Sequence, residues 1–177
     1  MVDSNPFDYS CQHTTMAYGP NEDHSLNDLP IDAHSGSWAA WLGGDNNETS
    51  IIKQQVTVPT QAPYLTFWYA IGSNDNDCGP DVGDVGGVTV NGEAVAASWL
   101  CTDTQTDGWV QDSIDLRAYA GQSITLALLA ATDESYSSNF FIDDVSFQAS
   151  QVTSQGMVTS FSTIDDVLSG KIEDIVK

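Results

Sequence analysis

The chain has 177 residues, which suits one domain with a sizeable core, and its 41% hydrophobic and 10% aromatic content is that of a globular protein. It carries 25 acidic and only 4 basic residues, for a formal charge of −21, which argues against binding nucleic acid or an anionic membrane through a basic face. So acidic a surface favours a setting rich in salt or divalent cations, and we expect a secreted or cell-surface protein. The alternative is that the acidic residues serve solubility alone.

Short strands separated by turn residues dominate the chain from residue 36 to residue 148. The expected strands span residues 36–44, 50–58, 64–71, 88–90, 93–100, 109–116, 123–132 and 139–148, with a short first strand at 7–9. Asn91-Gly92 is typical of a two-residue hairpin turn. Residues 72–87, dense in Gly, Asp and Asn, are expected to form a loop. Many short strands without intervening helices predict an all-β antiparallel sandwich over residues 1–150.

The pattern changes after residue 150. Residues 151–177 are predicted to form a linker and a short amphipathic helix, because apolar residues recur there at helical spacing from Ile164 to Val176. A helix this short needs a surface to dock on, which is either the sandwich itself, a partner subunit or a further domain. No apolar run approaches the length of a membrane span, so we expect no membrane insertion.

The stretch 138–147 places carboxylates among apolar residues. If it is a strand, Asp143 shares a face with Phe141, and Asp144 shares the other face with Phe140. A buried, unpaired carboxylate costs several kcal/mol, and the four Lys and Arg residues offer few partners. A hard cation such as calcium is therefore the first hypothesis. The alternative is an Asp at the strand's end that is turned to solvent or caps a loop.

The loop after residue 72 suggests a second cation site. Asp75, Asp77 and Asp81 lie in a segment that begins with D-x-D-x-G spacing but lacks the Glu of an EF-hand. The alternative is an Asx-rich turn. Cys78 and Cys101 flank a hairpin, so a local disulfide is reasonable in an oxidising compartment, which leaves Cys11 without a partner in the chain.

Aromatic residues suggest a ligand-binding platform. If the β-strand alternation turns the other residues to the core, then Trp41, Tyr64 and Trp68 face outward, where they suit a carbohydrate or a peptide. The alternative is that other parts of the chain cover them. Catalysis has little support, because no nucleophile, zinc-protease or phosphate-loop motif occurs. A glycosidase built on an Asp pair is the remaining catalytic alternative.

Several segments, taken together and in order, are similar to modules of secreted bacterial proteins. These segments are AHSGSWAAWLGG (33–44), QVTVP (55–59), LTFWY (65–69), GWV (108–110), DLRAYAGQ (115–122) and NFFIDDV (139–145). They resemble MAM-like jelly-roll modules and the cleaved-adhesin domains of surface adhesins and proteases. The resemblance covers roughly residues 7–148.

This resemblance implies a jelly-roll β-sandwich without catalytic machinery and with a structural calcium. Carried over by position, the calcium ligands are Asp143 and Asp8, with Asp32 and the carbonyl of His34 as further positions. Asp144 either joins them or points to solvent. The resemblance also supports a disulfide between Cys78 and Cys101.

The sequence thus favours a non-catalytic, calcium-binding extracellular module that binds a carbohydrate or protein ligand in adhesion. Two alternatives remain open. One is a structural subunit that self-associates through edge strands or the C-terminal helix in the presence of calcium. The other is an accessory domain of a secreted hydrolase.

Overall fold

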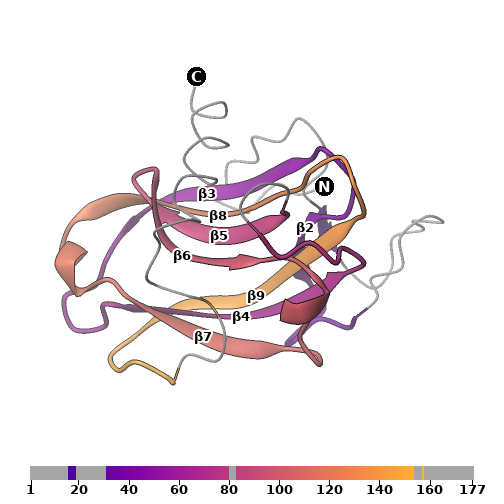
Figure 1. The fold of residues 1–177 in the computed structure, drawn as a ribbon. Coiled ribbons are helices and arrows are strands. Elements are labelled where there is room, and N and C mark those ends of the chain that lie inside the picture. The colour runs from indigo at the N-terminus through magenta and orange to yellow at the C-terminus, as the bar shows by residue number, and fades with distance from the viewer. Residues whose placement is uncertain (1–15, 19–30, 80–82, 154–156, 158–177) are drawn as a thin grey trace.

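Two antiparallel sheets packed face to face form the protein (Figure 1). The computed structural model describes residues 16–18, 31–79, 83–153 and 157. The five-stranded sheet has the spatial order β1 (Met16–Tyr18), β2 (Ala39–Gly43), β9 (Ser138–Gln148), β4 (Tyr64–Ser73) and β7 (Val110–Asp115). The four-stranded sheet has the order β3 (Thr49–Thr57), β8 (Ser123–Ala131), β5 (Val85–Val90) and β6 (Glu93–Trp99).

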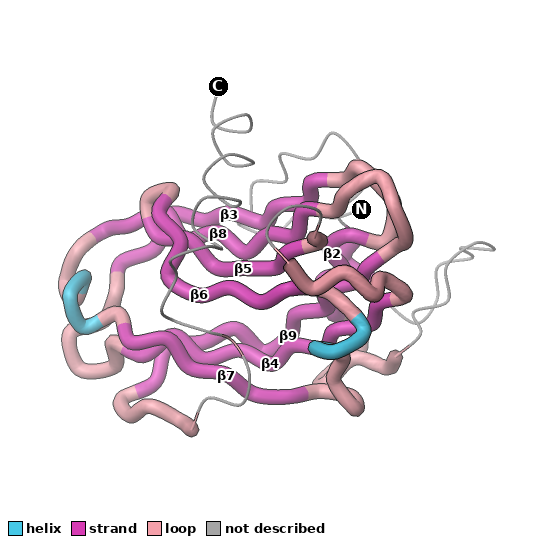
Figure 2. The backbone as a smooth tube through the Cα atoms, viewed as in Figure 1, coloured by secondary structure: helices cyan, strands magenta, loops and turns pink. Residues whose placement is uncertain are grey.

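Helical structure in the described part of the chain is confined to two single 3₁₀ turns. They are η1 (Thr102–Thr104) and η2 (Arg117–Tyr119), and they lie at opposite ends of the sandwich (Figure 2). No described helix is long and apolar enough to cross a membrane. The predicted all-β, two-sheet antiparallel architecture is confirmed, whereas the jelly-roll connection stays a prediction. The expected strand at 7–9 and the expected C-terminal helix lie outside the described residues.

The core lies between the sheets and follows the predicted alternation. On β4, Leu65, Phe67 and Tyr69 are buried, and they meet Phe140 of β9 within one apolar cluster. Met157 joins the same cluster, and its backbone N–H donates to Asp112 Oδ2 at 3.0 Å. The chain beyond residue 150 therefore packs back onto the sandwich at this point.

Both predicted boundaries of the loop after β4 are wrong. The expected loop 72–87 is shorter, because β4 continues to Ser73 and β5 already begins at Val85. The glycine at position 86 lies inside this buried strand, where a Cβ would come within 3.0 Å of Leu100 and Phe140. Glycine is used here for close packing between the sheets rather than for a turn.

The closing strand is also less regular than predicted. Trp68 pairs with Asp143 and Thr66 with Ser146, so two residues of β9 stand opposite one residue of β4 in a bulge. Asp144 lies in this bulge with φ of 49°. The bulge shifts the alternation, which is why Asp143 is half-buried and Asp144 exposed instead of one of them facing the core.

Gly43 at the end of β2 is a position where a side chain should not be tolerated. Its φ is +73°, and a Cβ would lie 2.5 Å from the carbonyl oxygen of Ser138. We expect Gly43→Ala to lower the free energy of unfolding by roughly 1–3 kcal/mol, measured by urea denaturation. Gly36→Ala is the matched control, because Gly36 has φ of +61° but a Cβ there would meet no atom within 4 Å. Equal losses for both variants would mean that the close contact with Ser138 has no energetic weight.

Candidate functional site

Three aromatic side chains gather on the outer face of the five-stranded sheet. Trp68 lies between two buried residues of β4, so the strand alternation turns it away from the core. The His34 ring stacks on it, with ring centroids 3.9 Å apart and planes inclined by 16°. Trp109, the residue before β7, meets the His34 ring edge-on at 6.1 Å, and its indole N–H donates to the Asp32 carbonyl at 2.8 Å. These contacts fix the segment that carries Asp32 and His34 against the sheet.

Two carboxylates lie beside these rings. Asp143 is the cross-strand partner of Trp68, and its Oδ2 accepts the backbone N–H of Ser35 at 3.1 Å. Asp144 accepts the Ser35 hydroxyl at 2.6 Å and lies 2.7 Å from His34 Nδ1. The hydrogen bond from Ser35, and secondarily that from His34, holds the pKa of Asp144 below its ordinary value. We call Asp32, His34, Ser35, Trp68, Trp109, Asp143 and Asp144 the aromatic–carboxylate cluster.

Four residues predicted to bind calcium lie in this cluster: Asp32, His34, Asp143 and Asp144. The described contacts do not call for a cation there. Asp143 Oδ1 accepts the N–H of Asp144, and the other three oxygens of the pair have the partners given above. None of the four oxygens is therefore left without a partner. Asp8 lies outside the described residues, so calcium at Asp143 stays a prediction.

The other two predicted platform residues lie elsewhere and are each engaged. The Trp41 indole N–H donates to Asn139 Oδ1 at 2.9 Å, and its ring packs against Phe141. The Tyr64 ring lies under the guanidinium of Arg117, 5.6 Å from the ring centroid. Both side chains are half-buried. The expected row of three outward rings is therefore divided, and only Trp68 belongs to the aromatic–carboxylate cluster.

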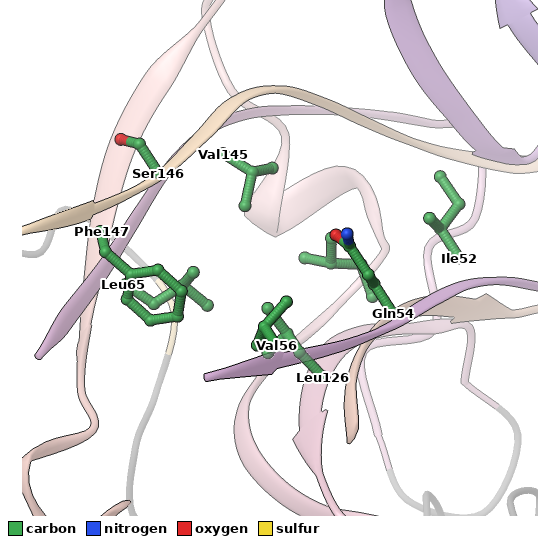
Figure 3. A pocket seen from close by; sticks show the side chains of 9 residues that line it. Ile52, Gln54, Val56, Leu65, Leu126, Val145, Ser146 and Phe147 are labelled. Atoms are coloured by element: carbon green, nitrogen blue, oxygen red, sulfur yellow. The ribbon is translucent and has the colours of Figure 1, made fainter. Parts of the chain in front are cut away.

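A separate apolar groove of about 230 Å³ opens between the two sheets. Figure 3 shows side chains of β9 on one side of it and those of β3 on the other. Its lining residues are Ile52, Gln54, Val56, Leu65, Leu126, Leu128, Val145, Ser146 and Phe147. With polar side chains only at Gln54 and Ser146, this groove offers few groups for recognising a polar ligand.

The loop after β4 contains part of a second cluster of acidic residues. The predicted disulfide between Cys78 and Cys101 is present, with Cα atoms 5.6 Å apart. Asp75 is buried, whereas Asp77 is exposed and donates its backbone N–H to Asp75 Oδ1 at 2.8 Å. Asp81 lies outside the described residues.

Two members of this second group were not predicted from the sequence. Asp84 and Asp133 come together with Asp75, so that one carboxylate oxygen of each residue lies within 4.8 Å of the others. Asp84 directly precedes β5, and Asp133 follows β8. Each of these two residues lies next to a buried strand, which was the signal that the sequence offered. The sequence does not show, however, which strand ends lie close together.

No family model matches the sequence, and no curated protein matches it. Several solved structures are similar in fold. TmCBM61, solved in complex with β-1,4-galactotriose, is 18% identical with a TM-score of 0.46, over 66% of this chain and 73% of that chain. The K2 cleaved adhesin domain of Lys-gingipain is 20% identical with a TM-score of 0.44, over 67% of this chain and 75% of that chain. A cyclase from Fischerella sp. TAU is 14% identical with a TM-score of 0.41, over 86% of this chain and 93% of that chain.

These neighbours include binding modules and an enzyme. A cleaved-adhesin domain is among them, as the resemblance predicted, while the MAM-like assignment stays a prediction. Identities this low, with TM-scores below 0.5, identify neither a family nor a function for this chain. Its function has to be inferred from its own residues.

Proposed function

We propose that this chain is a non-catalytic, extracellular binding module of the jelly-roll type that recognises a carbohydrate through the aromatic–carboxylate cluster. The observation that carries the proposal is the juxtaposition of His34, Trp68 and Trp109 with the carboxylates of Asp143 and Asp144 on one sheet face. The disulfide supports an oxidising, extracellular setting.

A saccharide has the two kinds of surface that this cluster complements. The C–H groups on a face of a sugar ring pack against aromatic rings, and the hydroxyl groups donate to carboxylates. Trp109 is half-buried and Asp144 exposed, so both kinds of group reach the surface. Trp38, whose side chain is 51% exposed, follows Ser35 closely in the chain and extends the aromatic character of this segment.

The ionisation of Asp144 favours binding over hydrolysis. Glycoside cleavage needs a carboxylic acid whose pKa is raised so that it can protonate the leaving group. The pKa of Asp144 is instead lowered by Ser35 and His34, so it stays an acceptor. Asp84 has a raised pKa, caused mainly by burial, but its side chain is inaccessible to a substrate.

The test is retardation of the full chain in native gels that contain soluble β-galactan, xylan or mixed-linkage β-glucan. We expect retardation by at least one polymer and a roughly tenfold weaker association for Trp109→Ala, since loss of one stacking ring costs about 1–1.5 kcal/mol. Asp143→Asn, which keeps the shape of the side chain, should also weaken binding.

Tyr136→Ala is the matched control, because Tyr136 is 61% exposed but lies in the loop before β9, away from Asp143. It should bind as the parent does. A Tyr136→Ala loss as large as that of Trp109→Ala would contradict the assigned face, and no retardation by any polymer would contradict a carbohydrate ligand.

A further inference from the structure

A second group of acidic residues lies at the η1 end of the sandwich. Asp75 and Asp84 lie at the two ends of the loop between β4 and β5, and Asp133 lies in the loop after β8, so two loops contribute the three carboxylates. We call these residues the triaspartate cluster. Asp75 is 1% exposed and Asp84 is fully buried, while Asp133 is half-buried. Exposed acidic residues are ordinary in so acidic a chain, but buried ones need compensation.

The hydrogen bonds leave one oxygen of each carboxylate free. Each Oδ1 is engaged: that of Asp75 accepts the N–H of Asp77 at 2.8 Å, and that of Asp84 accepts the N–H of Asp133 at 2.7 Å. Asp133 Oδ1 accepts both the N–H and the hydroxyl of Ser135, at 2.7 and 2.9 Å. Each Oδ2 is buried and has no hydrogen-bond partner among the described residues. Such orphaned buried acceptors are rare, and three in one place indicate a missing ligand.

No described basic residue neutralises this charge. Of the Lys and Arg residues in the described ranges, Arg117 is paired with Asp115 at 2.6 Å. Lys53 lies opposite Ala127 in the middle of β3, four residues from the end of β8 that leads to Asp133. Burial, with the charges of Asp133 and Asp75 adding to it, outweighs the lowering effects of the Ser138 side chain and of the Asp133 N–H and raises the pKa of Asp84. Hydrogen bonds hold the three side chains in place although their charges repel.

We propose that the triaspartate cluster binds a hard divalent cation, and that the cation is Ca²⁺. Calcium takes oxygen ligands at about 2.3–2.6 Å, so two ligands on opposite sides of one ion lie roughly 4.6–5.2 Å apart. One carboxylate oxygen of each residue lies within 4.8 Å of the others, so a single ion can contact all three. Magnesium binds oxygen at about 2.0–2.1 Å in a strict octahedron and usually keeps several waters, so a buried group of three carboxylates suits it less. Zinc prefers nitrogen and sulfur ligands, which this cluster lacks.

The surrounding structure holds the ligands before the ion arrives. The Asp75 carbonyl accepts the N–H of Thr102 at 2.7 Å, and the Asp84 carbonyl accepts the N–H of Leu100 at 2.8 Å. The disulfide from Cys78 to Cys101 closes the same loop. This site is also separate from the predicted one at Asp143. Asp133 lies in the loop before β9, whereas Asp143 lies five residues beyond the first residue of β9, or roughly 16 Å further along that strand.

The experiment is calorimetric titration of Ca²⁺ into the calcium-stripped full chain at about 0.15 M KCl, which screens diffuse attraction to the acidic surface. We expect the parent to bind Ca²⁺ and Asp84→Asn and Asp133→Asn each to weaken that binding at least about tenfold, since affinity follows ligand charge. Mg²⁺ should compete poorly.

The matched control is Asp107→Asn, which removes the same charge from an exposed loop residue and should leave the affinity unchanged. Asp143→Asn separates the two candidate sites. The proposal is overturned if the parent binds no Ca²⁺, if Asp107→Asn weakens binding as much as Asp84→Asn, or if only Asp143→Asn does. None of these results depends on a carbohydrate, so the test is independent of the proposed function.

Discussion

Asp84→Asn is expected to be more stable than the parent in EDTA and less stable than the parent in excess calcium. Without a cation, the variant removes a buried charge that has no basic partner, and it keeps an oxygen that can accept the N–H of Asp133. A buried ion without a partner carries a desolvation penalty of several kcal/mol, so removing this charge should stabilise the calcium-free protein by about 1 kcal/mol or more. In calcium, the parent gains about 4 kcal/mol when the ion is present at a thousand times its Kd, and the variant should gain little of this.

The measurement is urea unfolding of both proteins, each in EDTA and in excess Ca²⁺. We expect the order of stability to reverse: the variant is the more stable protein in EDTA, and the parent is the more stable protein in Ca²⁺. Asp107→Asn should follow the parent in both conditions, which controls for the general relief of self-repulsion in a chain of charge −21. If Asp84→Asn loses the same stability in both conditions, Asp84 serves only to hold the loop of Asp133.

The sandwich was predictable because each strand has a recognisable pattern in its own local sequence. Alternation along residues 64–71 marks the buried face of β4, and Asn91-Gly92 supplies the hairpin, with φ of 55° and 91° at the two positions. What local pattern could not show is the bulge in β9. Its extra residue follows from how β9 pairs with β4, and it moves Asp143 and Asp144 away from the core.

The triaspartate cluster was only partly predictable for a related reason. Asp75 stood out because it begins a dense acidic loop, and the spacing in that loop pointed to Asp77 and Asp81 as its partners. In the structure the other two carboxylates belong to Asp84, at the far end of the same loop, and to Asp133, in the loop after β8. Val85 pairs with Ala131 in an antiparallel register. This register brings Asp84, just before Val85, close to Asp133, which follows Ala131. Contacts of this kind depend on sheet order, which the sequence pattern does not contain.

The aromatic platform shows that alternation predicts strand residues but not the irregular segments that cover them. The alternation correctly turned Trp68 outward, but it said nothing about residues 31–38, which have no regular period. His34 comes from that irregular segment and covers one face of the Trp68 ring. The usable surface is therefore made of Trp109, His34 and carboxylates rather than of three bare rings.

Removing the disulfide is expected to destabilise the chain more in calcium than in EDTA. Cys78 and Cys101 are 23 residues apart, and closing a loop of that length contributes about 3 kcal/mol. That loss should appear in EDTA when Cys78→Ser/Cys101→Ser is compared with the parent by urea unfolding. Both proteins should carry Cys11→Ser, so that thiol exchange does not complicate the comparison.

The additional loss in calcium follows from where the disulfide lies. Asp75 is three residues before Cys78, and its carbonyl accepts the N–H of Thr102, the residue after Cys101. Without the covalent tie, ordering this loop has to be offset by cation binding, so the affinity for Ca²⁺ should fall. The difference between the two losses measures the coupling of disulfide and ion. Equal losses in the two conditions would show that the loop holds Asp75 in place without the disulfide.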